Sequence, residues 1–259
     1  MTPAQGAPPA ADYSVELPVG LLDPSGRLHR TAALRKMRGY EEDLLYDTRL
    51  DGGRLITALL SACVVRVGDV SPVTAELIAE LTSADRDYLL VELRRISLGS
   101  RLDGQHTCPA CRAPLRVVDD LGALPVRRLP ADALPYSVDL ELEDGYTDRE
   151  GTTHRTVTLR LPTGHDESFV ARTAERDPIR ARDALLLRCI TAFGDLGPAQ
   201  LEGFGGQVLR SLSLADRRTL WQAFVHDRPG VDFHRRIDCP QCGHRFRAVM
   251  DAADFFGQG

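Results

Sequence analysis

Two Cys-Pro-x-Cys motifs contain the residues of this sequence whose types and spacing are most suited to chemistry. Cys108 and Cys111 form the first motif, and Cys239 and Cys242 form the second. Two residues between cysteines let a tight turn aim both sulfurs at one point, and four thiolates make the tetrahedral shell that structural zinc prefers. The four cysteines therefore predict one structural Zn²⁺ site, whose closed shell leaves no open position for a catalytic water.

The two motifs are far apart in the sequence, because 127 residues lie between Cys111 and Cys239. A zinc ribbon has about 15–20 residues between its cysteine pairs. We therefore expect the ion to join two distant parts of the chain, and closing so long a loop would lower the entropy of the unfolded state. The alternatives are a redox CxxC pair, which normally begins a helix in a thioredoxin-like setting, reduced thiols, and another metal.

The chain contains an internal repeat. The second cysteine motif follows the first at an offset of 131, and this offset extends without a gap over residues 84–111. Further upstream, residues 58–69 match 184–195 at an offset of 126, and residues 23–42 match 148–167 at an offset of 125. The matches occur in one order with small insertions between them. This pattern predicts a tandem duplication.

The repeat divides the chain into five parts. Residues 13–119 form repeat 1 and residues 137–250 form repeat 2, each predicted as a β-hairpin, helices and a cysteine motif. Residues 120–136 contain three prolines and predict a semi-stiff, extended linker. Residues 1–12 predict a disordered tail, and residues 251–259 form a C-terminal tail. The expected fold class is α+β, with the two cysteine knuckles joined in one zinc-ribbon-like site.

Each repeat is expected to open with a hairpin. Residues 23–26 and 148–151 have Asp first and Gly fourth, which suits a type I turn. The second strand of each hairpin is predicted over 28–34 and 153–161. The first repeat has Leu-Pro-x-Gly at residues 17–20, before its turn. In the second repeat Leu140 is followed by Glu141, so this pattern has no counterpart there.

Helices are expected between each hairpin and each cysteine motif. Apolar runs predict helical regions over 54–66 and 178–193. A last helix in each repeat has its own start signal, a variant of the capping box that begins at Thr82 and at Ser213 with Asp three residues later.

Other side chains have a structural interpretation, and some of them also have a functional alternative. His29 and His154 stand in repeated His-Arg-Thr segments, which are interpreted as an exposed polar strand face, or alternatively as a duplicated partner-binding face. Cys63 and Cys189 occupy matched positions in apolar helices and are expected to be core thiols. The phenylalanines at 255–256 are expected to fold back onto their own domain, with docking on a partner as the alternative.

Composition narrows the class of protein. The chain is 43% apolar and 27% charged with a net charge of -5, which is ordinary for a globular protein and lacks a basic signature for phosphate binding. Nothing predicts a membrane span or an export signal, so we expect a cytoplasmic protein in which stable disulfides are rare. Nucleotide loops and nucleophile or metalloprotease motifs are missing, so neither an enzyme nor a small-molecule substrate is expected.

Residues 15–45 resemble a known family pattern. Its elements are Leu-Pro-x-Gly at 17–20, the turn at 23–26, His29-Arg30, Leu34-Arg35 and the acidic Gly39-x-Glu41-Glu42. This stretch is similar to the T-even-phage baseplate hub assembly chaperones, which are encoded in contractile phage tails and in contractile injection system clusters of bacteria.

The resemblance implies a role in protein–protein assembly and brings no catalytic residues. It implies partners among baseplate, hub or spike proteins, and a protein that either leaves after assembly or stays in the particle. The residues themselves leave a second class open, a zinc-ribbon nucleic-acid-binding or regulatory protein, because residues 233–238 and 244–247 are locally basic. The net charge makes nucleic acid the weaker of the two expectations.

Overall fold

The computed structural model describes residues 13–130, 132–133, 136–225, 228–250 and 255–256. The two expected tails therefore lie outside the described residues, apart from Phe255 and Phe256. The mixture of helices and strands confirms the α+β class. No helix among the described residues is long and apolar enough to cross a membrane.

The two halves of the chain have a similar order of elements, and the second half has one additional short strand before its last hairpin. The first half consists of β1 (Tyr13–Leu22), β2 (Leu28–Leu34), α1 (Gly39–Leu45), α2 (Gly52–Cys63), β3 (Val64–Val67), α3 (Ala75–Glu80), α4 (Ser83–Leu98), β4 (Arg101–Thr107) and β5 (Pro114–Asp120). The second half consists of β7 (Ser137–Thr147), β8 (Thr153–Arg160), α5 (Gly164–Ala174), α6 (Pro178–Cys189), β9 (Ile190–Phe193), α7 (Pro198–Ser211), α8 (Leu214–Val225), β10 (Gly230–Val231), β11 (His234–Asp238) and β12 (Arg245–Val249).

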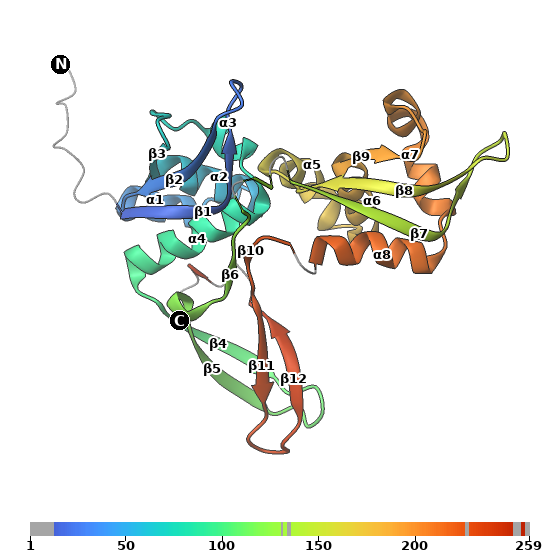
Figure 1. Cartoon of the computed structure of the whole chain (residues 1–259). Helices are drawn as coiled ribbons and strands as arrows, with labels where there is room; N and C mark the ends of the chain where they lie inside the picture. Colours follow the sequence, from blue (N-terminus) through green and yellow to red (C-terminus); the bar gives the residue numbers. More distant parts are fainter. Residues whose placement is uncertain (1–12, 131, 134–135, 226–227, 251–254, 257–259) are drawn as a thin grey trace.

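Each half has its own three-stranded antiparallel sheet and its own apolar core. The sheet orders are β1-β2-β3 and β7-β8-β9. Helices pack against each sheet, and two long hairpins, β4–β5 and β11–β12, project together away from the two bodies (Figure 1). The fold thus brings the ends of the two halves side by side.

The helical predictions extended too far at their C-terminal ends. Helix α2 ends at Cys63, and residues 64–67 form the third strand of the first sheet, where Ala32 pairs with Val67. In the second half, α6 ends at Cys189 and β9 pairs with β8 in the same way. The residues after Cys63 are Val-Val-Arg-Val, and β-branched side chains fit a strand better than a helix.

The predicted turns are confirmed, and a buried histidine supports each of them. The Gly26 N–H donates to the Asp23 carbonyl at 2.9 Å, and His29 Nε2 lies 2.9 Å from Asp23 Oδ2. His154 Nε2 lies 3.1 Å from Asp148 Oδ2 at the second turn. Both histidines are only 5% exposed, so the exposed-face interpretation is wrong for them. Each ring fills the space beneath its own turn.

Each of the two predicted capping boxes forms one of its two expected hydrogen bonds. Thr82 Oγ1 accepts from the Asp85 N–H at 3.2 Å, as expected for a helix start. The Asp85 carboxylate accepts from the Thr82 hydroxyl at 2.8 Å, and it also accepts from the backbone N–H groups of Val19 at 2.8 Å and Gly20 at 3.1 Å. Burial raises the pKa of Asp85, and these donors act against that rise. The carboxylate therefore ties β1 to the start of α4.

The second half has the same tie between a strand and a helix start. Asp216 accepts from Glu143 N at 2.8 Å and Gly145 N at 2.9 Å, and the N–H of Asp216 donates to Ser213 Oγ. Gly20 and Gly145 both have positive φ, at 98° and 76°, in the bulge of the first strand. The Leu-Pro-x-Gly pattern at residues 17–20 therefore does have a counterpart in the second half, at residues 142–145. The counterpart keeps the leucine and the glycine and lacks only the proline.

A buried arginine joins the two halves. Arg86 is 1% exposed, and its Nε lies 3.1 Å from Glu167 Oε2 in α5 of the other half. Its Nη1 and Nη2 groups donate to the carbonyls of Ile78 and Gly53. Beside Arg86, the Ser83 N–H donates to the Pro162 carbonyl of the other half at 2.8 Å.

The segment between the halves is extended, with one short 3₁₀ turn. It contains η1 (Leu121–Ala123) and β6 (Val126–Arg127), and β6 pairs with β10. Phe255 folds back, as expected, but it packs in the core of the first half and contacts Phe233 at a ring-centroid distance of 5.8 Å. The C-terminal end of the chain thus helps to build the first core.

The junction gives a test with a matched control. A Cβ at Gly164 would lie 2.6 Å from Arg86 Nη1, whereas a Cβ at the corresponding Gly39 would meet nothing within 4 Å. Both glycines are the first residue of a helix. We expect Gly164→Ala to lower the free energy of unfolding by about 1–3 kcal/mol, because the guanidinium is buried and cannot swing away freely.

Urea denaturation of the purified chain measures this difference. Gly39→Ala is expected to change the free energy of unfolding by no more than about 0.5 kcal/mol. Equal losses in the two variants would contradict the close contact at Arg86.

Candidate metal centre

The cysteine motifs form two matching turns at the tips of the projecting hairpins. In the first turn, Cys108 N donates to the Ala113 carbonyl and Arg112 N donates to the Cys108 carbonyl, both at 2.9 Å. In the second turn, Cys239 N donates to the His244 carbonyl and the N–H of Gly243 donates to the carbonyl of Cys239, again at 2.9 Å. Strands enter and leave each turn, so neither pair begins a helix.

The residue after each motif has a left-handed backbone. Arg112 has φ of 63°, and Gly243, at the corresponding place, has φ of 69°. Glycine adopts this backbone without a steric cost, which suits Gly243 to its place. The first turn achieves the same backbone with an arginine, which is strained there because its Cβ crowds the following carbonyl.

The structure brings the four predicted sulfurs together. All four Sγ atoms lie within 4.8 Å of one another. Cys108 Sγ is 3.8 Å from Cys242 Sγ, and Cys111 Sγ is 3.7 Å from Cys239 Sγ. Four sulfurs bound tetrahedrally at about 2.3 Å from one ion would be about 3.8 Å apart. The donor set therefore fits a four-coordinate metal ion.

The cluster has a buried side and an exposed side. Cys108 and Cys239 are buried, whereas Cys111 and Cys242 are exposed. Beneath the buried pair lies a small apolar cluster drawn from both hairpins, which contains Ala113, Leu115 and Ile237. This packing is too small to hold the hairpins by itself, since it amounts to a few side chains.

The pKa values of two thiols in the cluster are shifted in opposite directions. The backbone N–H of Cys111 lowers the pKa of Cys108 to about 6, because it donates to the thiolate. The N–H of His244 acts likewise on Cys242, but the neighbouring sulfurs raise the pKa of Cys242 to about 12. Several thiolates at this spacing repel one another, and a divalent cation removes that repulsion.

Arg235 connects the two hairpins beside the cluster. It pairs with Asp119 of β5 and with His106 of β4. A Cβ at Gly104 would lie 3.1 Å from Arg235 Nη2, so a small residue there leaves room for the guanidinium. Sequence reasoning missed this role, because it treated Arg235 only as part of a basic segment.

The two histidines that flank the cysteine motifs are outside the group of potential ligands. His106 contacts Arg235, and the ring of His244 stacks on Phe246 with centroids 6.2 Å apart. Cys63 and Cys189 lie elsewhere, fully buried in the two cores, where burial raises the pKa of each thiol to about 12. The expectation that these two are core thiols is confirmed.

Comparison with known proteins gives one match. The family model for the T4 bacteriophage base plate protein matches residues 12–257, nearly the whole chain. The chain belongs to this family. No curated protein and no solved structure matches it.

Membership of the base plate protein family confirms the resemblance noted at residues 15–45. It also indicates protein partners in a phage tail and incorporation into a tail particle. The match covers both halves of this base plate protein and both cysteine motifs.

The matched backbone at Arg112 and Gly243 gives a test of the turns. We expect Gly243→Ala to lower the free energy of unfolding by about 1–2 kcal/mol, because an L side chain is strained at this φ. A Cβ there would meet nothing within 4 Å, so the loss would come from the backbone alone. Arg112→Gly is expected to leave stability unchanged or to raise it by up to about 0.5 kcal/mol.

Chemical denaturation of the two variants and the parent chain measures these changes. Gly39→Ala, at a helix start without positive φ, serves as the control. A loss of stability in Arg112→Gly as large as that in Gly243→Ala would show that the two turns do not share one backbone requirement.

Proposed function

We propose that the chain is a non-enzymatic assembly factor or structural component of the baseplate hub of a phage-tail-like contractile injection system. The observation that carries this proposal is the family match over residues 12–257. The role as a hub assembly chaperone is the finer part of the proposal, and it rests on the motifs at residues 15–45.

We further propose that Cys108, Cys111, Cys239 and Cys242 bind one structural zinc ion. The sulfur–sulfur distances of 3.7 and 3.8 Å support a tetrahedral ion, and an all-cysteine set is typical of structural zinc. When bound, the ion would supply a permanent link between the two hairpins. Because each hairpin belongs to a different half of the chain, the zinc site would clamp the halves together.

We infer that the two halves arose by tandem duplication, with residues 13–119 and 137–250 as the repeats and 120–136 as the linker. Matching contacts support this inference. Asp85 and Asp216 each bind the bulge of a first strand, and His29 and His154 each support a turn. Contacts of this detail at corresponding places are unusual between unrelated segments.

A nucleic-acid-binding function is the alternative, and one observation favours it. Arg236 and Arg247 lie exposed on β11–β12, as in a zinc ribbon with a basic face. The net charge of -5 opposes it, because binding to phosphates depends on many clustered basic residues.

Metal analysis of the full chain tests the zinc proposal. We expect about one zinc per chain, because four thiolates complete one closed shell. Cys242→Ser is expected to lose the zinc and to lower the midpoint of thermal unfolding, since a structural site stabilises only the folded state. His244→Ala is the matched control at the same turn and should retain the metal.

Three results would contradict the zinc proposal. They are two zinc ions per chain, no metal in a chain whose six cysteines are all reduced, and loss of zinc from His244→Ala.

Co-expression with the hub, spike, tube and sheath proteins encoded beside the gene tests the assembly role. We expect a stable complex with a hub or spike protein and none with sheath protein, measured by affinity purification followed by size-exclusion chromatography. Tight, salt-sensitive binding to DNA without any complex with these proteins would support the alternative instead.

A further inference from the structure

Arginines gather in a groove that the assembly role does not explain. The groove has a volume of about 610 Å³ and lies between the β6–β10 pair and the β11–β12 hairpin. Among the described residues, five arginines line it together with one carboxylate, Asp232; they are Arg127, Arg228, Arg235, Arg236 and Arg247. The chain as a whole has a net charge of -5, so this arginine groove has the opposite sign to the rest of the molecule.

Two of these arginines face each other without a counter-ion. Arg236 pairs directly opposite Arg247 in the register of β11 and β12, and both are exposed. Among the ion pairs formed by the described residues, none includes Arg236, Arg247 or Arg228. Like charges directly opposite each other destabilise a two-stranded sheet. An anion that lies across the pair would remove this repulsion.

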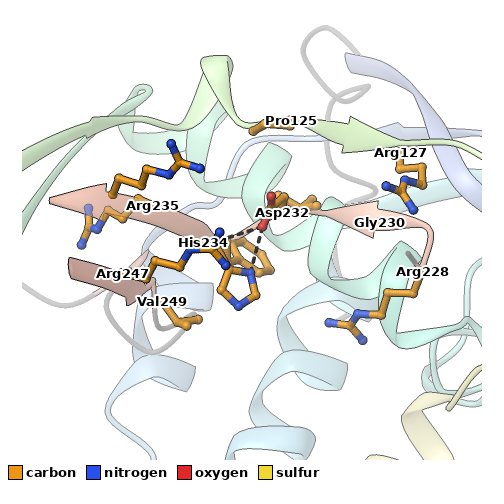
Figure 2. Close-up of a pocket in the computed structure, with 12 residues that line it drawn as sticks. Pro125, Arg127, Arg228, Gly230, Asp232, His234, Arg235, Arg247 and Val249 are labelled. Carbon is orange, nitrogen blue, oxygen red and sulfur yellow. Dashed lines mark hydrogen bonds and ion pairs between the residues drawn. The ribbon is translucent and has the colours of Figure 1, made fainter. Parts of the chain in front are cut away.

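Asp232, the carboxylate among the described residues that line the groove, is already engaged. Asp232 Oδ1 accepts from His234 N at 2.9 Å and lies 2.9 Å from His234 Nδ1. Figure 2 shows Asp232 and His234 in the middle of the groove, with Arg235 and Arg247 toward one end and Arg127 and Arg228 toward the other. The positive groups thus flank the middle on two sides, which suits an extended anion better than a small one.

The groove offers charge, and among the described residues that line it the exposed ring is the imidazole of His234, which is engaged with Asp232. Phe233 lines it, but the ring of Phe233 packs against Phe255 and the first core. Proteins that bind single-stranded nucleic acid combine basic residues with aromatic rings on which bases stack. Guanidinium groups also bind carboxylates through paired hydrogen bonds, and this needs no ring.

We propose that the arginine groove binds an acidic segment of a partner protein, rich in aspartate and glutamate. The occupant is a protein rather than nucleic acid because the chain outside the groove carries a net negative charge and its family indicates protein partners. This inference rests on the proposed function, which supplies a protein partner in the tail. The groove supplies the chemistry by which that partner is recognised.

Fluorescence anisotropy with a labelled oligoglutamate peptide and the full chain tests the proposal. We expect salt-sensitive binding that weakens roughly tenfold or more in Arg236→Gln/Arg247→Gln, because two arginine forks are lost. The control is Arg210→Gln/Arg218→Gln, which removes the same charge from exposed positions on α7 and α8 and should bind as the parent chain does.

Other results would overturn the proposal. These are no peptide binding, equal weakening in both double variants, or tighter binding of single-stranded or duplex DNA that the groove variant abolishes. A chain that self-associates through the groove, seen as a dimer that the groove variant dissolves, would also overturn it.

Co-purification with the hub or spike protein separates this inference from the proposed function. A complex that the groove variant loses and the control variant keeps would place the acidic segment on that partner. A complex that both variants keep would overturn the groove inference and leave the assembly role intact. A parent chain that binds the peptide but none of the hub or spike proteins would contradict the assembly role alone.

Discussion

The buried guanidinium of Arg86 is the constraint on which the arrangement of the two halves depends. A buried charge is tolerated only when it is paired and hydrogen-bonded, and Arg86 obtains its carboxylate, Glu167, from the other half of the chain. Gly164 leaves the space that the guanidinium occupies. Once this contact fixes the halves, the hairpins that leave them run side by side, and four sulfurs separated by 127 residues of sequence can meet.

The second half satisfies the corresponding arginine by a different route. Arg217 donates to the Leu209 carbonyl, as Arg86 does to the Ile78 carbonyl, but its carboxylate is Asp183 of its own half. The position that matches Asp183 in the first half is a threonine, which cannot pair with a guanidinium. The arginine at this position therefore pairs within its own half in the second half and with the neighbouring half in the first.

Sequence patterns predicted local structure well where one residue type has one physical consequence. Asp and Gly at fixed places predicted both hairpin turns, and the structure contains both. The patterns failed where a long-range contact decided the outcome. Apolar character alone did not distinguish the strand after Cys63 from a continuation of helix α2, and the buried place of His29 depends on a turn that closes over its ring.

The sequence by itself determined the spacing of the four cysteines, the internal sequence repetition and membership of a base plate family, because spacing and repetition are properties of the linear chain. Only the tertiary structure decided which charges meet. Asp85 reaches the strand bulge as well as its own helix cap, and Arg235 bridges two hairpins. These contacts join residues far apart in sequence, so no local propensity encodes them, and burial and pairing of charge select them only when the chain is folded.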